Sequence, residues 1–208
     1  MAGNVVFIHG FQDCNFDPQE KGQKIKERLE NCGWKVFSLT YSEGKPTKQS
    51  LRDSTDKLAE EIRKQGLTKV DAIIGHSMGG LVACDLARAY RALGIKKVIM
   101  LETPVSGMPA WLLRIWAFIW QRNASYDWPS IQAMKKGNEY FEILFRGWPT
   151  HEIAVFQIEG SLGKFLGRFS KTPAWIRTYK FPKVRHDGPD GLRGNPEVLD
   201  CIAKILAT

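Results

Sequence analysis

Short β-branched segments alternate with amphipathic helical segments along the first half of the chain, and this alternation constrains the fold most. The predicted strands in this half are 5–8, 34–41, 70–74 and 97–101. The predicted helices between them are 17–32, 47–65 and 78–93, each closed by a glycine within or just beyond its last residues. Strands separated by helices of this length pair in parallel, with helices covering both faces of the sheet. The sequence therefore predicts an α/β protein with a mainly parallel sheet.

The alternation stops after Pro104 and resumes near residue 153. The segment of about 107–150 is rich in Trp and Pro and contains only helical patches. Strands are predicted again at 153–158 and 177–181, followed by a last helix that begins at Asn195-Pro196. A chain of 208 residues is the size of one domain. We therefore expect a single domain, 1–208, with a Trp-rich helical lid or cap inserted above the sheet.

Composition excludes several other classes of protein. Hydrophobic residues make up 43% of the chain and charged residues 25%, which is ordinary for a globular domain and not for a disordered, collagen-like or coiled-coil protein. The apolar stretch 108–120 is interrupted by Arg114 and is too short to span a bilayer. The first residues have no basic region or cleavage site of a signal peptide, so a cytoplasmic location is expected.

The cysteines give no metal or disulfide pattern. They are widely spaced and form no C-x-x-C or Cys/His motif, which predicts ordinary reduced thiols at Cys14, Cys32, Cys84 and Cys201. We expect neither a metal nor an organic cofactor.

One motif indicates chemistry. Gly75-His76-Ser77-Met78-Gly79 matches G-x-S-x-G and lies between a predicted strand and a predicted helix. So tight a turn strains the serine backbone and pushes its hydroxyl out at the carboxyl end of the sheet, where the first helix amides favour an oxyanion. The alternative is a Gly-rich turn whose serine only caps the helix. We interpret Ser77 as a nucleophile.

His9-Gly10 follows the first predicted strand, and Gly80 extends the serine motif to Gly-His-Ser-Met-Gly-Gly. With these two motifs the chain resembles the α/β-hydrolase superfamily. Within that superfamily it resembles the small lipases and esterases, and the order of elements agrees over 5–206. The resemblance implies a minimal α/β-hydrolase fold and an oxyanion hole made by the backbone amides of Phe11 and Met78. It also implies that His9 organises the oxyanion loop by hydrogen bonding.

A serine hydroxyl needs a base to remove its proton, and four histidines are available. His186 follows the last predicted strand and precedes the last helix, which is where this fold presents its base. His9 belongs to the oxyanion loop, His76 is the variable position of the turn, and His151 precedes a strand. His186 is therefore the predicted base.

The acid of the triad departs from the usual pattern. The family places an Asp after the penultimate strand, but no Asp or Glu occurs from residue 160 to 185. Some members place the acid after the strand that follows the nucleophile helix, and here that position is Glu102. An ionised carboxylate there would orient the imidazole. Glu102 is the predicted acid, and Glu159, Asp187 and Asp190 stay as alternatives.

The insertion suggests a substrate. Residues 109–120 place Trp and Leu around most of a predicted helix, and we expect Trp111, Leu112 and Trp116 to contact an apolar acyl group. The competing explanation is that these residues only pack a cap. The predicted function is an esterase or lipase that forms an acyl-enzyme on Ser77. A thioesterase, an amidase, an acyltransferase or a non-catalytic binding module on the same fold are the alternatives.

The charge of the chain indicates a second kind of partner. The net charge is +8, and the stretch 161–185 carries no acid. Its basic residues are Lys164, Arg168, Lys171, Arg177, Lys180, Lys183 and Arg185. They form either a solvated face or a docking site for an anionic membrane. No nucleic-acid motif is present, so the expected ligand is a small ester or lipid.

Overall fold

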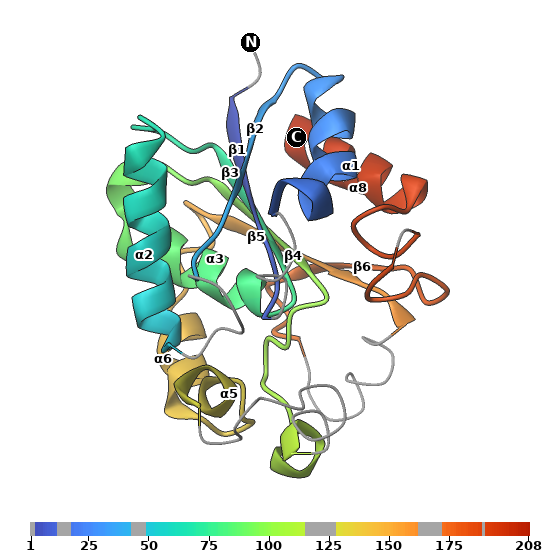
Figure 1. Ribbon diagram of the computed structural model, residues 1–208. Helices are drawn as coiled ribbons and strands as arrows, with labels where there is room; N and C mark the ends of the chain where they lie inside the picture. Colours follow the sequence, from blue (N-terminus) through green and yellow to red (C-terminus); the bar gives the residue numbers. More distant parts are fainter. Residues whose placement is uncertain (1–2, 12–17, 43–48, 115–127, 162–171, 189) are drawn as a thin grey trace.

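A computed structural model of the protein describes residues 3–11, 18–42, 49–114, 128–161, 172–188 and 190–208 (Figure 1). Within these ranges one all-parallel sheet has the strand order β2-β1-β3-β4-β5-β6. The strands are β1 Asn4–Ile8, β2 Lys35–Leu39, β3 Ala72–His76, β4 Lys97–Leu101, β5 Ala154–Glu159 and β6 Arg177–Lys180. The helices of the alternation are α1 Pro18–Glu30, α2 Leu51–Lys64, α3 Met78–Ala89 and α8 Pro196–Ala207. The predicted fold class, with a parallel sheet and alternating helices, is confirmed.

Several predicted bounds differ from those of the structure, and three of the differences have a clear cause. The helix expected over 78–93 ends at Ala89, because Tyr90 leaves the helical region with φ −113° and ψ 59°, and a short 3-10 helix, Arg91–Leu93, follows. The strand expected at 70–74 is β3, two residues later, since the Val70 amide bonds to the Leu93 carbonyl outside the sheet. The strand expected over 34–41 is limited to the five residues of β2, all paired with β1.

The start of α2 was missed although the sequence contains its signal. The Ser50 side chain accepts from the Asp53 amide, and the Asp53 side chain accepts from the Ser50 amide. This capping box fixes the first turn at Leu51. A Ser followed by an acid three residues later is readable in the sequence, so the predicted start at 47 was avoidable.

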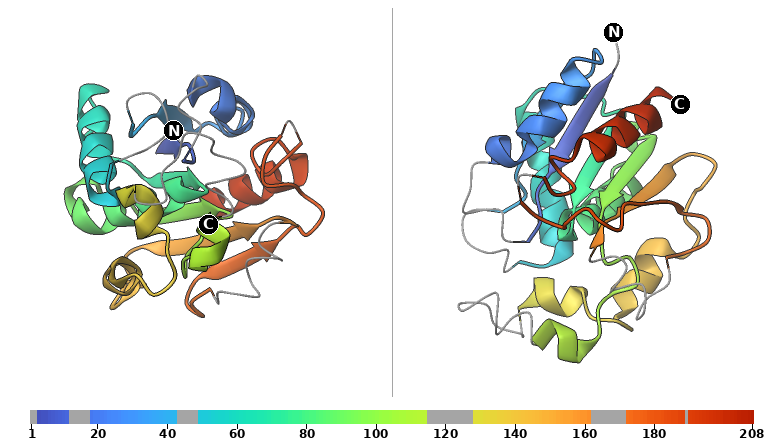
Figure 2. Two further views of the ribbon diagram at one scale, coloured as in Figure 1. Left: turned by 60° about the horizontal axis from the view of Figure 1, so that its bottom comes forward. Right: turned by 90° about the vertical axis from the view of Figure 1, so that its right-hand side faces the viewer.

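Each face of the sheet is covered by its own pair of helices (Figures 1 and 2). Val5 and Phe7 of β1 pack in one buried cluster with side chains of α1 and α8. Val6 and Ile8 point the other way and pack in a second cluster with side chains of α2 and α3. Full burial of each such side chain stabilises the fold by about 1.5–3 kcal/mol. Two apolar faces hold the sheet rigid, so its carboxyl edge is a firm platform.

The described parts of the insertion lie at the carboxyl end of the sheet (Figure 2). It contains α5 Pro129–Ala133, α6 Glu139–Phe145 and a helical stretch at 110–114. Buried Ile131, Phe141 and Leu144 join the cluster formed by α2 and α3. The insertion therefore shares a core with the sheet along the parts that the structure describes.

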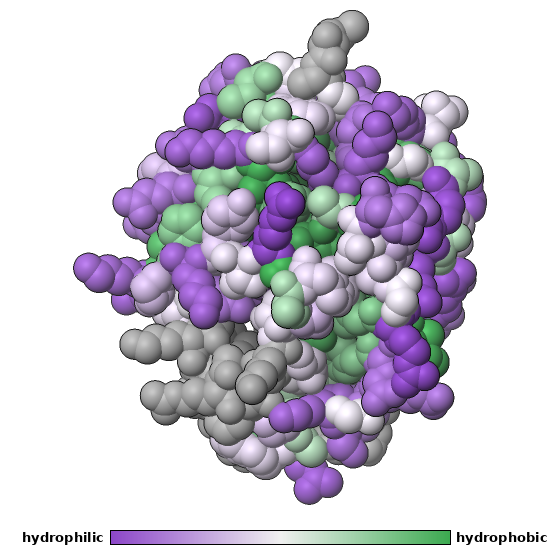
Figure 3. Space-filling model, turned by 180° about the vertical axis from the view of Figure 1, so that it is seen from behind, coloured by the Kyte–Doolittle hydropathy of each residue, from purple (hydrophilic) through white to green (hydrophobic). Residues whose placement is uncertain are grey.

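Seen from behind, the surface is mainly hydrophilic, with hydrophobic side chains showing between the charged ones (Figure 3). The large hydrophobic residues that are exposed lie apart in the sequence: Trp111, Ile143 and Tyr179. No helix in the described ranges combines the length and the hydropathy needed to cross a membrane.

Candidate active site

Ser77 occupies the sharp turn between β3 and α3. Its φ of 52° and ψ of −125° are a strained conformation for a residue with a side chain. Its amide donates to the Leu101 carbonyl at 2.8 Å, which ties the turn to the end of β4. The turn closes only because its neighbours are small, since a Cβ on Gly75 would lie 2.5 Å from the Gly79 backbone. A Cβ on Gly79 would lie 2.3 Å from the His9 carbonyl oxygen.

The loop after β1 lies against this turn. A Cβ on Gly10 would be 3.1 Å from the Ser77 Cβ, so the backbone that leads to Phe11 passes beside the serine. His9 is fully buried and its Nδ1 donates to the Gly10 carbonyl at 2.7 Å, while its Nε2 is 2.9 Å from Thr40 Oγ1. The ring also stacks on Tyr41 at 4.5 Å between centroids. These contacts fix the course of the loop at the strand ends.

The loop and the turn meet at a characteristic place in the topology. The chain passes from β1 outward to β2 and then returns to β3 on the other side of β1. Open α/β sheets bind their ligands outside the carboxyl ends of the strands at such a reversal. Met78 begins α3 there, and the first amides of a helix have no acceptor within the helix.

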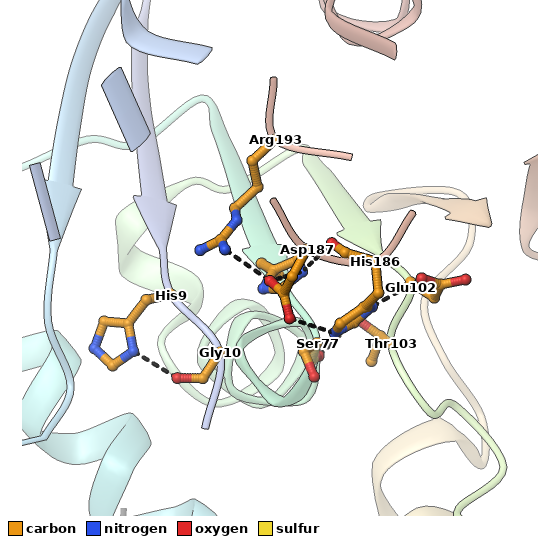
Figure 4. A network of polar contacts seen from close by, with 9 residues as sticks. His9, Gly10, Ser77, Glu102, Thr103, His186, Asp187 and Arg193 are labelled. Carbon is orange, nitrogen blue, oxygen red and sulfur yellow. Dashed lines mark hydrogen bonds and ion pairs between the residues drawn. The ribbon is translucent and has the colours of Figure 1, made fainter. Parts of the chain in front are cut away.

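The imidazole of His186 is bound to a buried carboxylate. Nδ1 of His186 donates to Oε2 of Glu102 at 2.8 Å (Figure 4). The Glu102 side chain is 1% exposed and that of His186 is 21% exposed. With its proton on Nδ1, a neutral imidazole presents the lone pair of Nε2 outward. The structure thus joins two of the residues predicted to form the triad.

The backbone of Glu102 is also strained, with a φ of 50°. Its amide donates to the Ile158 carbonyl at 2.8 Å, which holds the residue across the end of β5. A Cβ on Gly160 would lie 3.3 Å from both carboxylate oxygens and 2.6 Å from the Val184 carbonyl oxygen. The glycine leaves room for the carboxylate to reach His186.

Ser77 and His186 come to the same strand end without a hydrogen bond between them. The rings of His76 and His186 are 4.4 Å apart between centroids, and His76 directly precedes Ser77. Figure 4 draws no contact between the Ser77 hydroxyl and the imidazole, and no such bond is present in the described part of the chain. Catalytic hydrogen bonds are often long or poorly aligned before substrate binds.

The alternative acids make other contacts. Glu159 accepts from Thr172 Oγ1 at 3.2 Å and is 4.0 Å from Lys180 Nζ. Asp187 faces the opposite nitrogen of the imidazole, with Oδ2 4.0 Å from Nε2 of His186. Asp190 is exposed. None of the three bonds to Nδ1 of His186.

Sequence reasoning missed three contacts of this site. His76 is 2% exposed and its Nε2 donates to the His186 carbonyl at 3.3 Å. Thr103 Oγ1 donates to the Ser77 carbonyl at 2.9 Å. Arg193 donates to Asp187 Oδ1 at 2.7 Å. The first two join residues 110 and 26 positions apart, a separation that leaves no local pattern to read.

Burial sets the charge of two of these groups. Desolvation, with help from the neighbouring His186 and Arg193, lowers the pKa of His76 well below its usual 6.5. His76 is therefore neutral near pH 7. Burial also lowers the pKa of Arg193, while Asp187 opposes that change.

Donor atoms of His76, His186 and Asp187 lie within 4.8 Å of one another, the only such group in the described ranges. Two of the three already have a protein contact, Nε2 of His76 with the His186 carbonyl and Oδ1 of Asp187 with the cationic Arg193, whereas His186 binds Glu102 through Nδ1 and not through Nε2. A guanidinium on the carboxylate opposes a second cation there. These contacts do not favour a metal centre.

Two of the three predicted substrate contacts, Trp111 and Leu112, belong to the described residues. The Trp111 residue is 51% exposed, and Leu112 is half-buried. Trp116 lies outside the described residues. A groove of about 420 Å³ lies between β6 and α8, and its lining includes Tyr179, Phe181 and Lys204. The groove contains none of the predicted site residues.

Two comparisons with known proteins match part of the chain. A model of the thioesterase domain matches residues 23–106. A curated 3-dehydroquinate synthase of Streptococcus gordonii is 32% identical over 84 residues, which are 40% of this chain. The chain spans only 22% of the length of that protein.

Solved structures match nearly the whole chain. A lipase of Bacillus licheniformis is 17% identical with a TM-score of 0.68, covering 98% of this chain and 91% of its own. An esterase from Exiguobacterium antarcticum is 15% identical with a TM-score of 0.62, covering 99% and 92%. A bromoperoxidase of Bacillus anthracis is 15% identical with a TM-score of 0.65, covering 100% and 93%. At these identities the likeness concerns the fold.

Proposed function

The chain has an α/β-hydrolase fold, and from that premise we propose that it is a serine hydrolase acting on acyl esters. The observation that carries the proposal is the 2.8 Å bond between His186 and the buried Glu102, at the strand end where Ser77 is strained. A base oriented by a carboxylate next to a strained serine is the arrangement that nucleophilic acyl transfer requires.

The reaction proceeds in two steps through Ser77. Its hydroxyl oxygen attacks the acyl carbonyl while Nε2 of His186 takes the hydroxyl proton, and Glu102 stabilises the imidazolium that forms. The proton then passes to the departing alcohol as the ester bond breaks. Water attacks the acyl-enzyme in the same way, and the acid leaves.

The amides of Phe11 and Met78 are the proposed oxyanion donors. The position of Met78 at the start of α3 and the passage of the Gly10 backbone beside Ser77 support this assignment. Preorganised donors of this kind are typically worth about 3–4 kcal/mol of transition-state stabilisation each.

The acyl group is proposed to be apolar. Exposed Trp111 and half-buried Leu112 offer apolar surface on the insertion, and Trp116 belongs to the same expected contact. A thioester is the second candidate substrate, favoured by the match of residues 23–106 to the thioesterase domain. Rates on p-nitrophenyl esters of increasing chain length, measured against acyl thioesters of the same acids, decide between them.

Ser77→Ala is the control for every substrate in that series. The ester proposal expects esters to be cleaved with a higher kcat/KM than thioesters and the variant to cleave neither. A higher kcat/KM for thioesters would make the thioester, and not the ester, the proposed substrate. Rates no higher than the uncatalysed background for both wild type and Ser77→Ala would point to the non-catalytic module.

An anionic membrane surface is a proposed partner. Exposed Arg177, Lys180, Lys183 and Arg185 support it, whereas Lys164, Arg168 and Lys171 lie outside the described residues. Attraction to anionic lipid is worth about 1 kcal/mol for each basic residue near the surface. Co-sedimentation with phosphatidylglycerol vesicles, and not with phosphatidylcholine vesicles, is the expected result. Equal sedimentation with both would refute the charge-based partner.

A further inference from the structure

A second carboxylate lies beside the imidazole of His186, opposite Glu102. Asp187 Oδ2 is 4.0 Å from Nε2 of His186 (Figure 4). Its Oδ1 is 3.8 Å from Nε2 of His76. Nε2 of His186 is the nitrogen that must take the proton of Ser77. A displacement of about 1 Å would bring the carboxylate into hydrogen-bond range of that nitrogen.

Such a bond would harm the proposed reaction. Once protonated, the imidazole would hold its Nε2 proton against Asp187 and not against the departing alcohol. A carboxylate at hydrogen-bond range also stabilises the charged imidazole, so fewer molecules carry a free base near pH 7. The base works best when Asp187 stays where it is.

Arg193 binds Asp187. Its NH2 donates to Oδ1 at 2.7 Å, and its side chain is 10% exposed whereas that of Asp187 is 61% exposed. The loop between Arg185 and Asn195 has its own backbone bonds, from Leu192 to Arg185 at 3.0 Å and from Asn195 to Gly191 at 2.8 Å. The guanidinium is therefore not required to close the loop.

We propose that Arg193 is a positioning residue of this site, which keeps the Asp187 carboxylate away from the outer nitrogen of His186. This inference rests on the proposed function of Ser77 and His186. In the part of the chain that the structure describes, the charged and titratable groups shown around the imidazole are Glu102 after β4, His76 at the end of β3, and Asp187 and Arg193 on its own loop. Arg193 offsets the charge of Asp187, and His76 is neutral, so Glu102 acts as the working counter-ion.

A cycle of variants tests the pairing. The pKa of His186 is followed by NMR titration of its ring protons in wild type, Arg193→Met, Asp187→Asn and the double variant. Arg193→Met is expected to raise the pKa of His186 by about one unit, because the carboxylate is freed and its cation is lost. Asp187→Asn is expected to lower it by about half a unit, and the double variant to return it close to the wild-type value.

The acid limb of kcat/KM against pH should move in the same directions. Arg193→Lys keeps the cation and is expected to restore most of the wild-type profile. Asp187 is exposed, so Asp187→Asn decides the matter alone if Arg193→Met does not fold. A His186 pKa that is unchanged in Asp187→Asn, or that moves the same way in both single variants, would overturn the inference.

The titration separates this inference from the proposed function. It needs no substrate, so an inactive protein with the expected shifts would overturn the proposed function and leave the pairing. An active protein whose His186 pKa does not respond would overturn the pairing alone.

Discussion

Glu102 and Glu159 are carried by the ends of neighbouring strands, yet their surroundings differ. The Glu102 side chain is 1% exposed, its φ is 50°, and it accepts a hydrogen bond from His186. The Glu159 side chain is 15% exposed and lies near Thr172 and Lys180. A buried carboxylate on a strained backbone needs a compensating partner, and such strain gathers at functional sites. The comparison separates a buried carboxylate bonded to His186, which is proposed to orient a base, from one that lies beside an exposed lysine.

The largest expected effect on activity comes from removing the Ser77 hydroxyl, the proposed nucleophile that His186 and Glu102 activate. Ser77→Ala should lower kcat by about 10⁴-fold or more, because the nucleophile itself is removed. Thermal unfolding should change little, since the hydroxyl makes no cap bond at the start of α3. The measurement is ester hydrolysis beside a melting curve. If Ser77→Ala kept more than a tenth of the activity, Ser77 would not be the nucleophile, and Glu102 would have no serine to activate through His186.

The two glutamates can be compared directly. Glu102→Gln should lower kcat by about 10²- to 10⁴-fold, because a neutral amide no longer stabilises the imidazolium. Glu159→Gln is the matched control and should stay within about twofold of wild type. The same assay on both variants gives the answer. If Glu159→Gln were the more damaging change, the acid would have to be reassigned.

Acid stability sharpens the contrast between buried and exposed groups at the strand ends. Burial lowers the pKa of His76, so its contribution to stability is complete above its usual 6.5 and is lost as the pH falls below that value. Below pH 6.5 the unfolded chain binds a proton at His76 that the folded chain does not bind. The free energy of unfolding therefore falls by on the order of 1 kcal/mol per pH unit. His76→Phe should flatten this part of the profile.

Urea denaturation at pH 7 and pH 5.5 measures the slope for that variant. His151→Gln is the control, because the His151 side chain is 80% exposed. A slope in His76→Phe equal to that of wild type would show that the buried imidazole does not control acid stability.

The smallest effect is expected at the other end of β4. Lys97 Nζ donates to the Ile205 and Leu206 carbonyls at 3.1 Å each, and so caps the end of α8. Lys97→Met should cost about 1 kcal/mol of unfolding free energy and leave kcat unchanged. Lys96→Met, at the exposed neighbouring position, is the control. A drop in kcat for Lys97→Met would contradict the claim that the start of β4 affects stability alone.

The fold was largely predictable because its signals are local. Hydrophobic runs, closing glycines and the Asn195 cap each act within one element, and β4 has the predicted bounds 97–101. The bounds of β3 were not predictable, because its pairing with β1 and β4 decides where the ladder begins.

The candidate site was predictable only where chain order carries information. The positions of His186 and Glu102 follow from the strands that precede them, and the structure joins them by a hydrogen bond. The packing of His76 against His186 and the pairing of Arg193 with Asp187 depend on how loops fold back, and no periodicity encodes that. The catalytic roles of His186 and Glu102 stay predictions.

Fluorophosphonate labelling with peptide mapping tests the nucleophile most directly. We predict one adduct, on the peptide that contains Ser77, forming much more slowly in His186→Ala than in wild type. An unlabelled protein, or an adduct on another residue, would contradict the assignment of Ser77 as a serine activated by His186.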